Sequence, residues 1–333
     1  RLASHRRVLA AVRARLSRYC LNVAASRLTT GHHALYLELE ARLREFFGAE
    51  DALLVSTGYV TNLVVGQALA GSFSHALIDE HSHPSLGDAA RFLDCPVLTF
   101  GHRNPEEAGR AVQRCGPGAK LILLTDGMFS RDGSAAPLAE YRRVLPKDAM
   151  ILVDDAHGAG VLGASGKGAV EQAGVSRRRL IQTVTLSKAF GSFGGAILGT
   201  AELRQRILDH SRLFVGSTPL PLPLAHAAKE ALAVLQNDPS LRKRLAHNAA
   251  YLKEALRERG LALAETPGPI VMLPPLPKAR TARLRHDLLA ARIFPPFLKY
   301  PGGPPSGYFR FVVCSEHTRR QLDQVVQAVG RNL

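Results

Sequence analysis

The side chains best suited to chemistry follow two short apolar runs of this 333-residue chain. Asp154 and His157 follow residues 150–153, and Lys188 follows residues 183–186. A carboxylate can hold the nitrogen of a heteroaromatic ring protonated, and a lysine amine can form an imine with an aldehyde. Pyridoxal phosphate (PLP) is a cofactor that needs both groups. The two motifs therefore favour a PLP site.

Each motif also has a simpler interpretation. Lys188 could be a surface lysine at the start of a loop; if it is buried instead, desolvation would lower its pKa and make it nucleophilic. Acids at strand ends also cap helices or bind metals. A metal site is the weaker alternative, because no further His or Cys cluster stands at ligand spacing. His157 could donate to the phenolate oxygen of the cofactor ring.

Two further segments could bind a phosphorylated ring. Residues 56–62, with Gly58 near their start, follow an apolar run and open a helix, and the backbone N–H groups of a helix N-terminus bind phosphate. Thr185 could reach the same phosphate with its hydroxyl group. The histidines of residues 81–85 could stack on the ring, lie in an ordinary loop, or form part of a metal site.

Short apolar runs alternate with helix-length segments, which predicts an α/β domain with a mostly parallel sheet. Ligands of such sheets bind where the strands end. The predicted strands are 52–55, 76–78, 121–124, 150–153, 183–186, 196–198 and, near the C-terminus, 309–313. Helices are predicted at 1–19, at 35–47 with Gly48 closing the helix, over about 224–259, and after an N-cap at Thr318.

The alternation of predicted strands and helices ends at the proline-rich residues 219–223. We therefore predict an N-terminal helical arm (1–30), a large PLP-binding α/β domain (31–225) and a small α+β domain (226–333).

Forty-three basic and 28 acidic residues give a net charge of +15. The basic clusters at 6–7, 177–179 and 242–244 could bind nucleic acid, but they are dispersed and lack interleaved aromatic residues. A solvated basic surface is the favoured account of the charge, and a field that attracts an anionic substrate such as a CoA thioester is an alternative.

The cysteines indicate where the protein works. Cys20, Cys95, Cys115 and Cys314 are scattered, which is typical of a reducing cytosol. No apolar run approaches the roughly 20 residues that span a bilayer. The arginine-rich start lacks the apolar core of a secretory signal, so a cytoplasmic protein is expected.

Taken together, seven segments resemble the α-oxoamine synthases, which are fold-type I PLP enzymes. The resemblance runs from about Ser26 to near the C-terminus, and residues 153–163 are its most specific part. The matching segments are 56–62, 79–86, 100–104, 125–133, 153–168, 185–195 and 217–219. The resemblance implies an α/β large domain with a smaller C-terminal α+β domain. It also implies condensation of an amino acid with an acyl-CoA thioester, with loss of CO2, to an α-aminoketone.

Roles carried over from the family fall on matching residues of this chain. Those at the cofactor ring are Lys188 as its covalent ligand, Asp154 at the pyridine nitrogen, His83 stacked on the ring, and Ser130 and His157 at the phenolate oxygen. Those at the phosphate are Gly58, Tyr59 and Thr185. Ser217 and Thr218 resemble the segment that reaches the neighbouring subunit's phosphate, which implies a homodimer with shared active sites. Arg310 matches the arginine that binds the amino-acid carboxylate.

The sequence departs from the family in three places, of which the first and the last concern the substrate pocket. A family stretch like Asn-Asp-Tyr-Leu-Gly-Leu has no counterpart in this sequence, Asp126 stands where glutamate is usual, and residues 294–304 differ from the usual run. Two alternatives therefore stay open: a PLP aminotransferase or aldolase of the same fold, and a basic binding protein that has lost activity.

Overall fold

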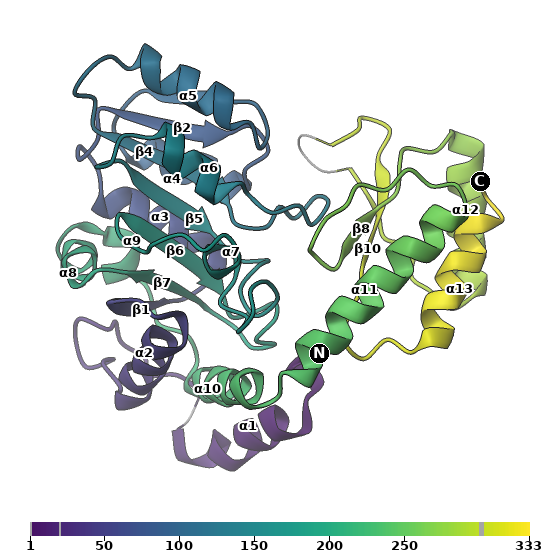
Figure 1. Ribbon diagram of the computed structural model, residues 1–333. Coiled ribbons are helices and arrows are strands. Elements are labelled where there is room, and N and C mark those ends of the chain that lie inside the picture. Colours follow the sequence, from purple (N-terminus) through teal and green to yellow (C-terminus); the bar gives the residue numbers. More distant parts are fainter. Residues whose placement is uncertain (1, 20, 300–302) are drawn as a thin grey trace. The chain divides into compact units, whose positions relative to one another are not determined.

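The computed structural model describes residues 2–19, 21–299 and 303–333. Cys20 and part of the 294–304 stretch therefore lie outside the described residues. The chain divides into two compact units (Figure 1). The first consists of Arg1–Met128 and Ala136–Asp238, and the second of Phe129–Ala135 and Pro239–Leu333.

The first unit is built on a mostly parallel sheet with the strand order β1-β7-β6-β5-β4-β2-β3. Within this sheet, β7 is the only described strand that runs opposite to the others. The strands are β1 (Asp51–Val55), β2 (His75–Asp79), β3 (Val97–Phe100), β4 (Leu121–Asp126), β5 (Met150–Asp154), β6 (Leu180–Thr185) and β7 (Gly195–Gly199). The predicted α/β fold is confirmed, and β3 is a strand that the sequence analysis missed.

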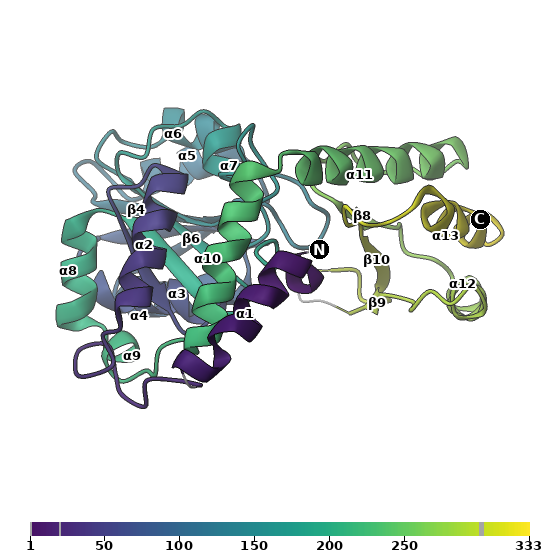
Figure 2. The ribbon, with the colours of Figure 1, turned by 90° about the horizontal axis from the view of Figure 1, so that it is seen from below.

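Helices pack on the sheet and bury its strands. One core joins the sheet to α3, α4, α8 and α9, and Figure 2 shows α1 lying alongside α10, which packs on α2. The helices of this unit are η1 (Leu2–Ser4), α1 (Arg6–Tyr19), α2 (Ala34–Phe47), α3 (Gly58–Ala68), α4 (Pro84–Phe92), α5 (Pro105–Arg114), α6 (Leu138–Val144), α7 (Ala169–Gln172), α8 (Ala201–His210), α9 (Arg212–Val215) and α10 (Leu222–Asn237).

The second unit has a small antiparallel sheet of β8 (Ile270–Met272), β10 (Tyr308–Val312) and β9 (Phe297–Leu298), in that order. It packs with α11 (Ser240–Glu258), α12 (Lys278–Ala290) and α13 (Arg319–Gly330) around one apolar core. Thr318 caps α13 in a capping box with Gln321, as predicted from the sequence.

The single helical stretch predicted over 224–259 is wrong. Two helices, α10 and α11, occupy it and are separated at Asp238-Pro239. Proline lacks the N–H that would continue the helix and clashes with the preceding turn. Helix α10 belongs to the first unit, so the division into units falls at Asp238 rather than near residue 225.

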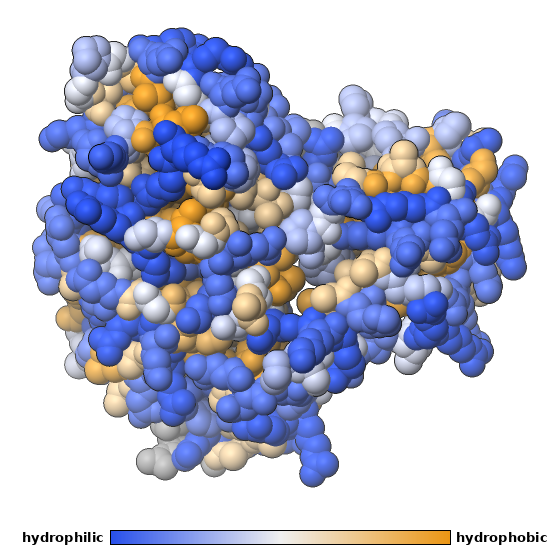
Figure 3. Space-filling model, viewed as in Figure 1, coloured by the Kyte–Doolittle hydropathy of each residue, from blue (hydrophilic) through white to orange (hydrophobic). Residues whose placement is uncertain are grey.

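Hydrophilic side chains cover most of the face of each unit seen in Figure 3, with apolar residues in small patches between them. Among the described residues, no helix is both long enough and apolar enough to cross a bilayer.

Candidate active site

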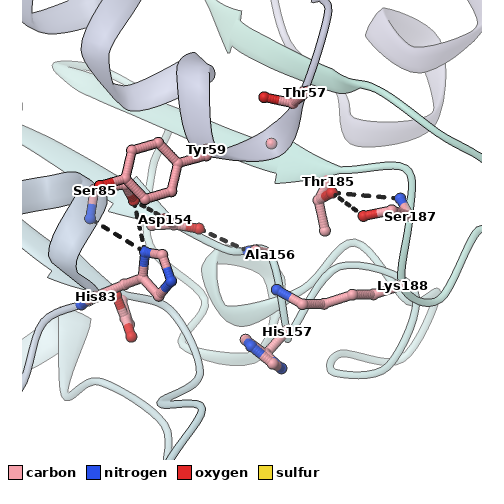
Figure 4. A pocket seen from close by; sticks show the side chains of 12 residues that line it. Thr57, Tyr59, His83, Ser85, Asp154, Ala156, His157, Thr185, Ser187 and Lys188 are labelled. Atoms are coloured by element: carbon pink, nitrogen blue, oxygen red, sulfur yellow. Dashed lines mark hydrogen bonds between the residues drawn. The ribbon is translucent and has the colours of Figure 1, made fainter. Parts of the chain in front are cut away.

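A cavity of about 260 Å³ opens in the first unit where strands β4, β5 and β6 end. This is the edge at which ligands of parallel sheets bind. The cavity brings together seven of the residues predicted from the sequence (Figure 4): Gly58, Tyr59, His83, Asp154, His157, Thr185 and Lys188. It is also lined by Thr57, Ser85, Asp126, Ala156 and Ser187.

Asp154 is the last residue of β5 and is only 7% exposed. Its Oδ2 accepts a hydrogen bond from Asn62 Nδ2 at 2.6 Å, and its Oδ1 accepts one from the backbone N–H of Ala156 at 3.1 Å. The two bonds fix the orientation of the side chain, so Asp154 presents its carboxylate to the cavity in a fixed position.

Asn62 and Ser85 position this carboxylate, and the sequence analysis gave neither a role. Asn62, fully buried on α3, also donates to Ser85 Oγ at 2.9 Å and accepts from Thr183 Oγ1 at 2.7 Å. Ser85 lies in the first turn of α4 and its hydroxyl is 3.5 Å from Asp154 Oδ2. The network therefore ties α3, α4 and β6 to the end of β5.

His83 precedes α4 and has both its backbone and its ring fixed. Its N–H donates to Asp126 Oδ1 at 3.0 Å, and its Nδ1 lies 2.7 Å from Ser85 Oγ. Burial lowers the pKa of His83, more than the Asp154 charge raises it. The ring of Tyr59 meets the His83 ring edge-on at 5.8 Å. A neutral, oriented imidazole suits stacking against a planar ring.

Asp126, at the end of β4, lies beside Asp154 in the parallel register. Burial raises the pKa of Asp126 well above its usual value, and the neighbouring Asp154 charge raises it further. Two adjacent buried carboxyl groups resist ionising together. A charge on Asp126 is therefore disfavoured, whereas Asp154 has a hydrogen-bond donor on each of its oxygens.

Asp155, the next residue, anchors the loop that carries His157. Its Oδ2 accepts from Gln182 Nε2 at 2.7 Å and from the N–H of Ala169 at 2.9 Å. A Cβ added at Gly127, Gly158 or Gly168 would overlap its carboxylate oxygens. Burial raises the pKa of Asp155 to about 7. Asp155 is thus architectural, while Asp154 faces the cavity.

The N-terminus of α3 meets the end of β6 across the cavity. Thr57 caps the helix, and its side chain accepts from the N–H of Val60 at 3.4 Å. Thr185 Oγ1 lies 2.8 Å from Ser187 Oγ. A Cβ on Gly58 would lie 2.6 Å from both Cβ and Oγ1 of Thr185. Only glycine lets the helix start approach these hydroxyls so closely, which forms a cradle suited to a phosphate.

Gly58→Ala is expected to weaken PLP retention at least about tenfold, because its Cβ would push the helix start away from Thr185. Equilibrium dialysis of PLP, followed by absorbance, measures the effect. Gly87→Ala on α4 is the matched control, since a Cβ there meets nothing within 4 Å. Equal PLP affinity of the Gly58 and Gly87 variants would show that the close approach is irrelevant.

Lys188 lies in a bend after β6 rather than in the strand, since the N–H of Leu186 bonds to Gly194 O at 2.9 Å. Of the two positions left open by the sequence, the exposed one is found: the side chain of Lys188 extends into the open cavity. Figure 4 shows it reaching toward the space between His83, Asp154 and His157. His157 is half-buried in the loop after β5.

Four predicted site residues do not line this cavity. Ser130 and Arg310 belong to the second unit, where Arg310 Nη1 donates to the Ser130 carbonyl oxygen at 2.6 Å. Ser217 and Thr218 follow α9; the Ser217 hydroxyl donates to Leu213 O, and Thr218 is exposed. The structure therefore gathers seven of the predicted residues around the cavity of the first unit, and it joins Ser130 to Arg310 in the second unit. Ser217 and Thr218 belong to neither group.

The donor set in the cavity fits PLP. A helix N-terminus and hydroxyl groups suit the phosphate, a fixed carboxylate suits the pyridine nitrogen, an oriented histidine suits the ring face, and a lysine suits the aldehyde. The Gly58 cradle supports this fit independently, because a side chain there would fill the phosphate end.

Comparisons with known proteins agree with this geometry. The model of the family "Aminotransferase class I and II" matches residues 1–329. The 8-amino-7-oxononanoate synthase of Thioalkalivibrio sulfidiphilus is 34% identical over 335 residues, which cover 100% of this chain and 86% of that protein.

Two solved structures are similar over 99% of this chain and 84% of their own, each with a TM-score of 0.93. One is the serine palmitoyltransferase of Sphingomonas wittichii, at 29% identity. The other is a serine palmitoyltransferase variant from S. paucimobilis with a PLP–myriocin adduct bound, at 26% identity. The family resemblance and the fold class predicted from the sequence are both confirmed. The chain therefore belongs to the aminotransferase class I and II family and, within it, to the α-oxoamine synthases.

Proposed function

We propose that this protein is a PLP-dependent acyltransferase that condenses an amino acid with an acyl-CoA thioester. Carbon dioxide and CoA leave, and an α-aminoketone is formed, as in the 8-amino-7-oxononanoate synthases it resembles. The full-length relatives support the reaction class. The observation that carries the proposal is one cavity holding Lys188, Asp154, His83 and the N-terminus of α3.

When bound, PLP supplies an electron-withdrawing ring that stabilises negative charge on the substrate α-carbon. Lys188 Nζ is the proposed covalent ligand of the cofactor and the base that takes the α-proton. Asp154, with both oxygens hydrogen-bonded, holds a proton on the ring nitrogen. His83 supports the ring face, and His157 with Ser130 donates to the ring oxygen.

The phosphate is assigned to Gly58, Tyr59 and Thr185. Tyr59 is oriented by a hydrogen bond from its hydroxyl to Asp88, and Thr185 is oriented through Ser187. These contacts fix the residues before the cofactor arrives, which lowers the entropic cost of binding.

Arg310 is the proposed ligand of the amino-acid carboxylate. Its Nη1 is held by the Ser130 carbonyl oxygen, whereas its buried Nε has no hydrogen-bond partner among the described residues. A buried donor without a partner is unfavourable, and a carboxylate is the acceptor that a guanidinium fork matches best.

Arg310→Lys is expected to raise the KM for the amino acid about 10- to 100-fold with a smaller change in kcat, since a lysine cannot form the bidentate contact. Initial rates over a range of amino-acid concentrations give both constants. Arg283→Lys, on the exposed face of α12, is the control. If Arg310→Lys had a lower kcat and an unchanged KM for the amino acid, Arg310 would have another role.

We further propose a homodimer in which Ser217 and Thr218 contact the phosphate bound by the partner subunit. The exposure of Thr218 and the family resemblance support this assignment. Light scattering after size exclusion should give twice the mass of one chain. A monomer that remains fully active would exclude shared sites.

An assay of amino acids against acyl-CoA thioesters tests the reaction. Alanine, glycine and serine, each paired with short and long acyl-CoAs, are scored for release of free CoA thiol. At least one pair should release thiol and CO2 in equal amounts. Transamination of an amino acid without thiol release from any pair would favour an aminotransferase instead.

A further inference from the structure

A second and larger cavity lies in the first unit at the other end of the parallel strands, where they begin. Its volume is about 850 Å³. The first residues of β4, β5 and β6 line it, whereas the catalytic cavity is lined by their last residues. Cavities of this size typically hold small organic ligands. The proposed acyltransferase chemistry makes no use of it.

Cationic side chains are the largest group in its polar lining: Lys120, Arg177, Arg178, Arg179 and Arg206. Arg177–Arg179 is one of the basic clusters that the sequence analysis left without a function. Lys120, Arg178 and Arg179 make no ion pair and no side-chain hydrogen bond within the described residues. Three unpaired cations at one cavity attract an anion.

Carboxylates also line the cavity, at Glu50, Asp148 and Glu202, but they are outnumbered by the cations. Glu50 is also engaged elsewhere, because its Oε1 accepts a hydrogen bond from the N–H of Ala201 at 3.1 Å. The lining therefore keeps a net positive charge.

Arg142 holds the turn formed by Arg177–Arg179 in a fixed conformation. Its guanidinium donates to the carbonyl oxygens of Ala149 at 3.1 Å, Arg178 at 2.7 Å and Arg179 at 2.8 Å. Arg179 has a left-handed backbone with φ of 56°, which a residue with a side chain adopts only when its surroundings impose it. Such a preorganised turn presents Arg178 and Arg179 at little further entropic cost.

Arg177 connects the turn to the interior. Its Nη1 donates to Gln182 Oε1 at 2.8 Å, and its buried Nη2 has no hydrogen-bond partner among the described residues. Burial lowers the pKa of Arg177 to about 10, although the Asp155 charge opposes the shift. A desolvated guanidinium adds to the positive potential beneath the cavity.

Apart from Ser72 and Thr200, the uncharged side chains of the lining are apolar. Leu69, Leu203 and Ile181 belong to the core of the unit, and Phe73 and Met150 pack against that core. A purely ionic ligand such as inorganic phosphate would leave this surface unused. The lining instead matches a molecule with phosphate groups at one end and an aromatic body at the other.

We propose that this cavity is a non-catalytic binding site for a nucleoside phosphate. The phosphates would pair with Arg178, Arg179 and Lys120, and the base would lie on the apolar lining beside Phe73. The source of such a group is either a free nucleotide or the nucleotide portion of CoA.

Calorimetric titration of the PLP-loaded protein with ADP, adenosine 3′,5′-bisphosphate and inorganic phosphate tests the proposal. Saturable binding of one of the two nucleotides is expected, at least about tenfold tighter than that of inorganic phosphate. Tighter binding of the bisphosphate would identify CoA as the source, and tighter binding of ADP a free nucleotide. Failure of both to saturate at millimolar concentration would overturn the proposal.

The variant R178Q/R179Q should weaken nucleotide binding at least about tenfold, since each lost guanidinium removes a charge-assisted bond. R280Q/R283Q removes the same charge from exposed positions on α12 and should change binding less than about twofold. Unfolding temperatures establish that both variants fold. Equal weakening by the two variants would show that the charge of the whole protein, and not this cavity, attracts the nucleotide.

Discussion

Replacing Lys188 with alanine is expected to lower the rate of condensation by at least about 10³-fold, because the variant loses both the covalent ligand of the cofactor and the base at the α-carbon. Lys188 is exposed in a bend after β6. Its removal should therefore leave the unfolding temperature almost unchanged. Thiol release under steady-state conditions measures the rate.

Borohydride reduction gives a second readout that does not depend on turnover. It should attach the cofactor permanently to the peptide that contains Lys188 in the wild-type protein, and to no peptide in the variant. Lys147→Ala, at an exposed lysine before β5, is the control and should behave like the wild type. Unchanged thiol release by the Lys188 variant, or cofactor found on another lysine, would remove Lys188 from the chemistry.

Asp154→Asn is expected to reduce kcat about 10²- to 10⁴-fold while weakening PLP retention much less. An amide cannot hold a proton on the ring nitrogen. Its NH2 group would also face the donor of either Asn62 or Ala156, where a carboxylate accepts from both. Rates and cofactor affinity, measured on the same preparation, separate the two effects.

Asp126→Asn provides the comparison for this prediction. Burial raises the pKa of Asp126 well above its usual value, which favours the protonated carboxyl group, and an amide resembles that form in shape and charge. Its loss of kcat should therefore be far smaller than that of the Asp154 variant. Equal losses in the two variants would mean that the charge is not localised on Asp154.

The sequence was sufficient to predict which central side chains line the cavity, because Asp154 and Lys188 each follow an apolar run. The buried strands at 150–154 and 180–185 need apolar residues, so a polar side chain at their end is conspicuous. Gly58 and Thr185 could be predicted as phosphate-binding residues in a similar way, because a helix start that binds phosphate has a local sequence signature.

What could not be predicted depends on which helices pack together. Asn62 and Ser85 are ordinary polar residues in the sequence, and they acquire a role only because α3 lies against α4 beneath β5. The exposure of Lys188 depends on the bend that Leu186 and Gly194 close. The break at Pro239 had a local signal, which the long helical periodicity on either side obscured.

The surroundings of Asp155 have a consequence for engineering this protein. Gly127 follows β4, whereas Gly158 and Gly168 lie in the loop after β5, yet each leaves space for the same carboxylate. A library that alters substrate choice by randomising residues near the end of β5 should keep these three positions as glycine, since any side chain there displaces the anchor of the His157 loop. The variable positions are better drawn from the second unit, so that changes in specificity do not also remove the fold of the catalytic edge.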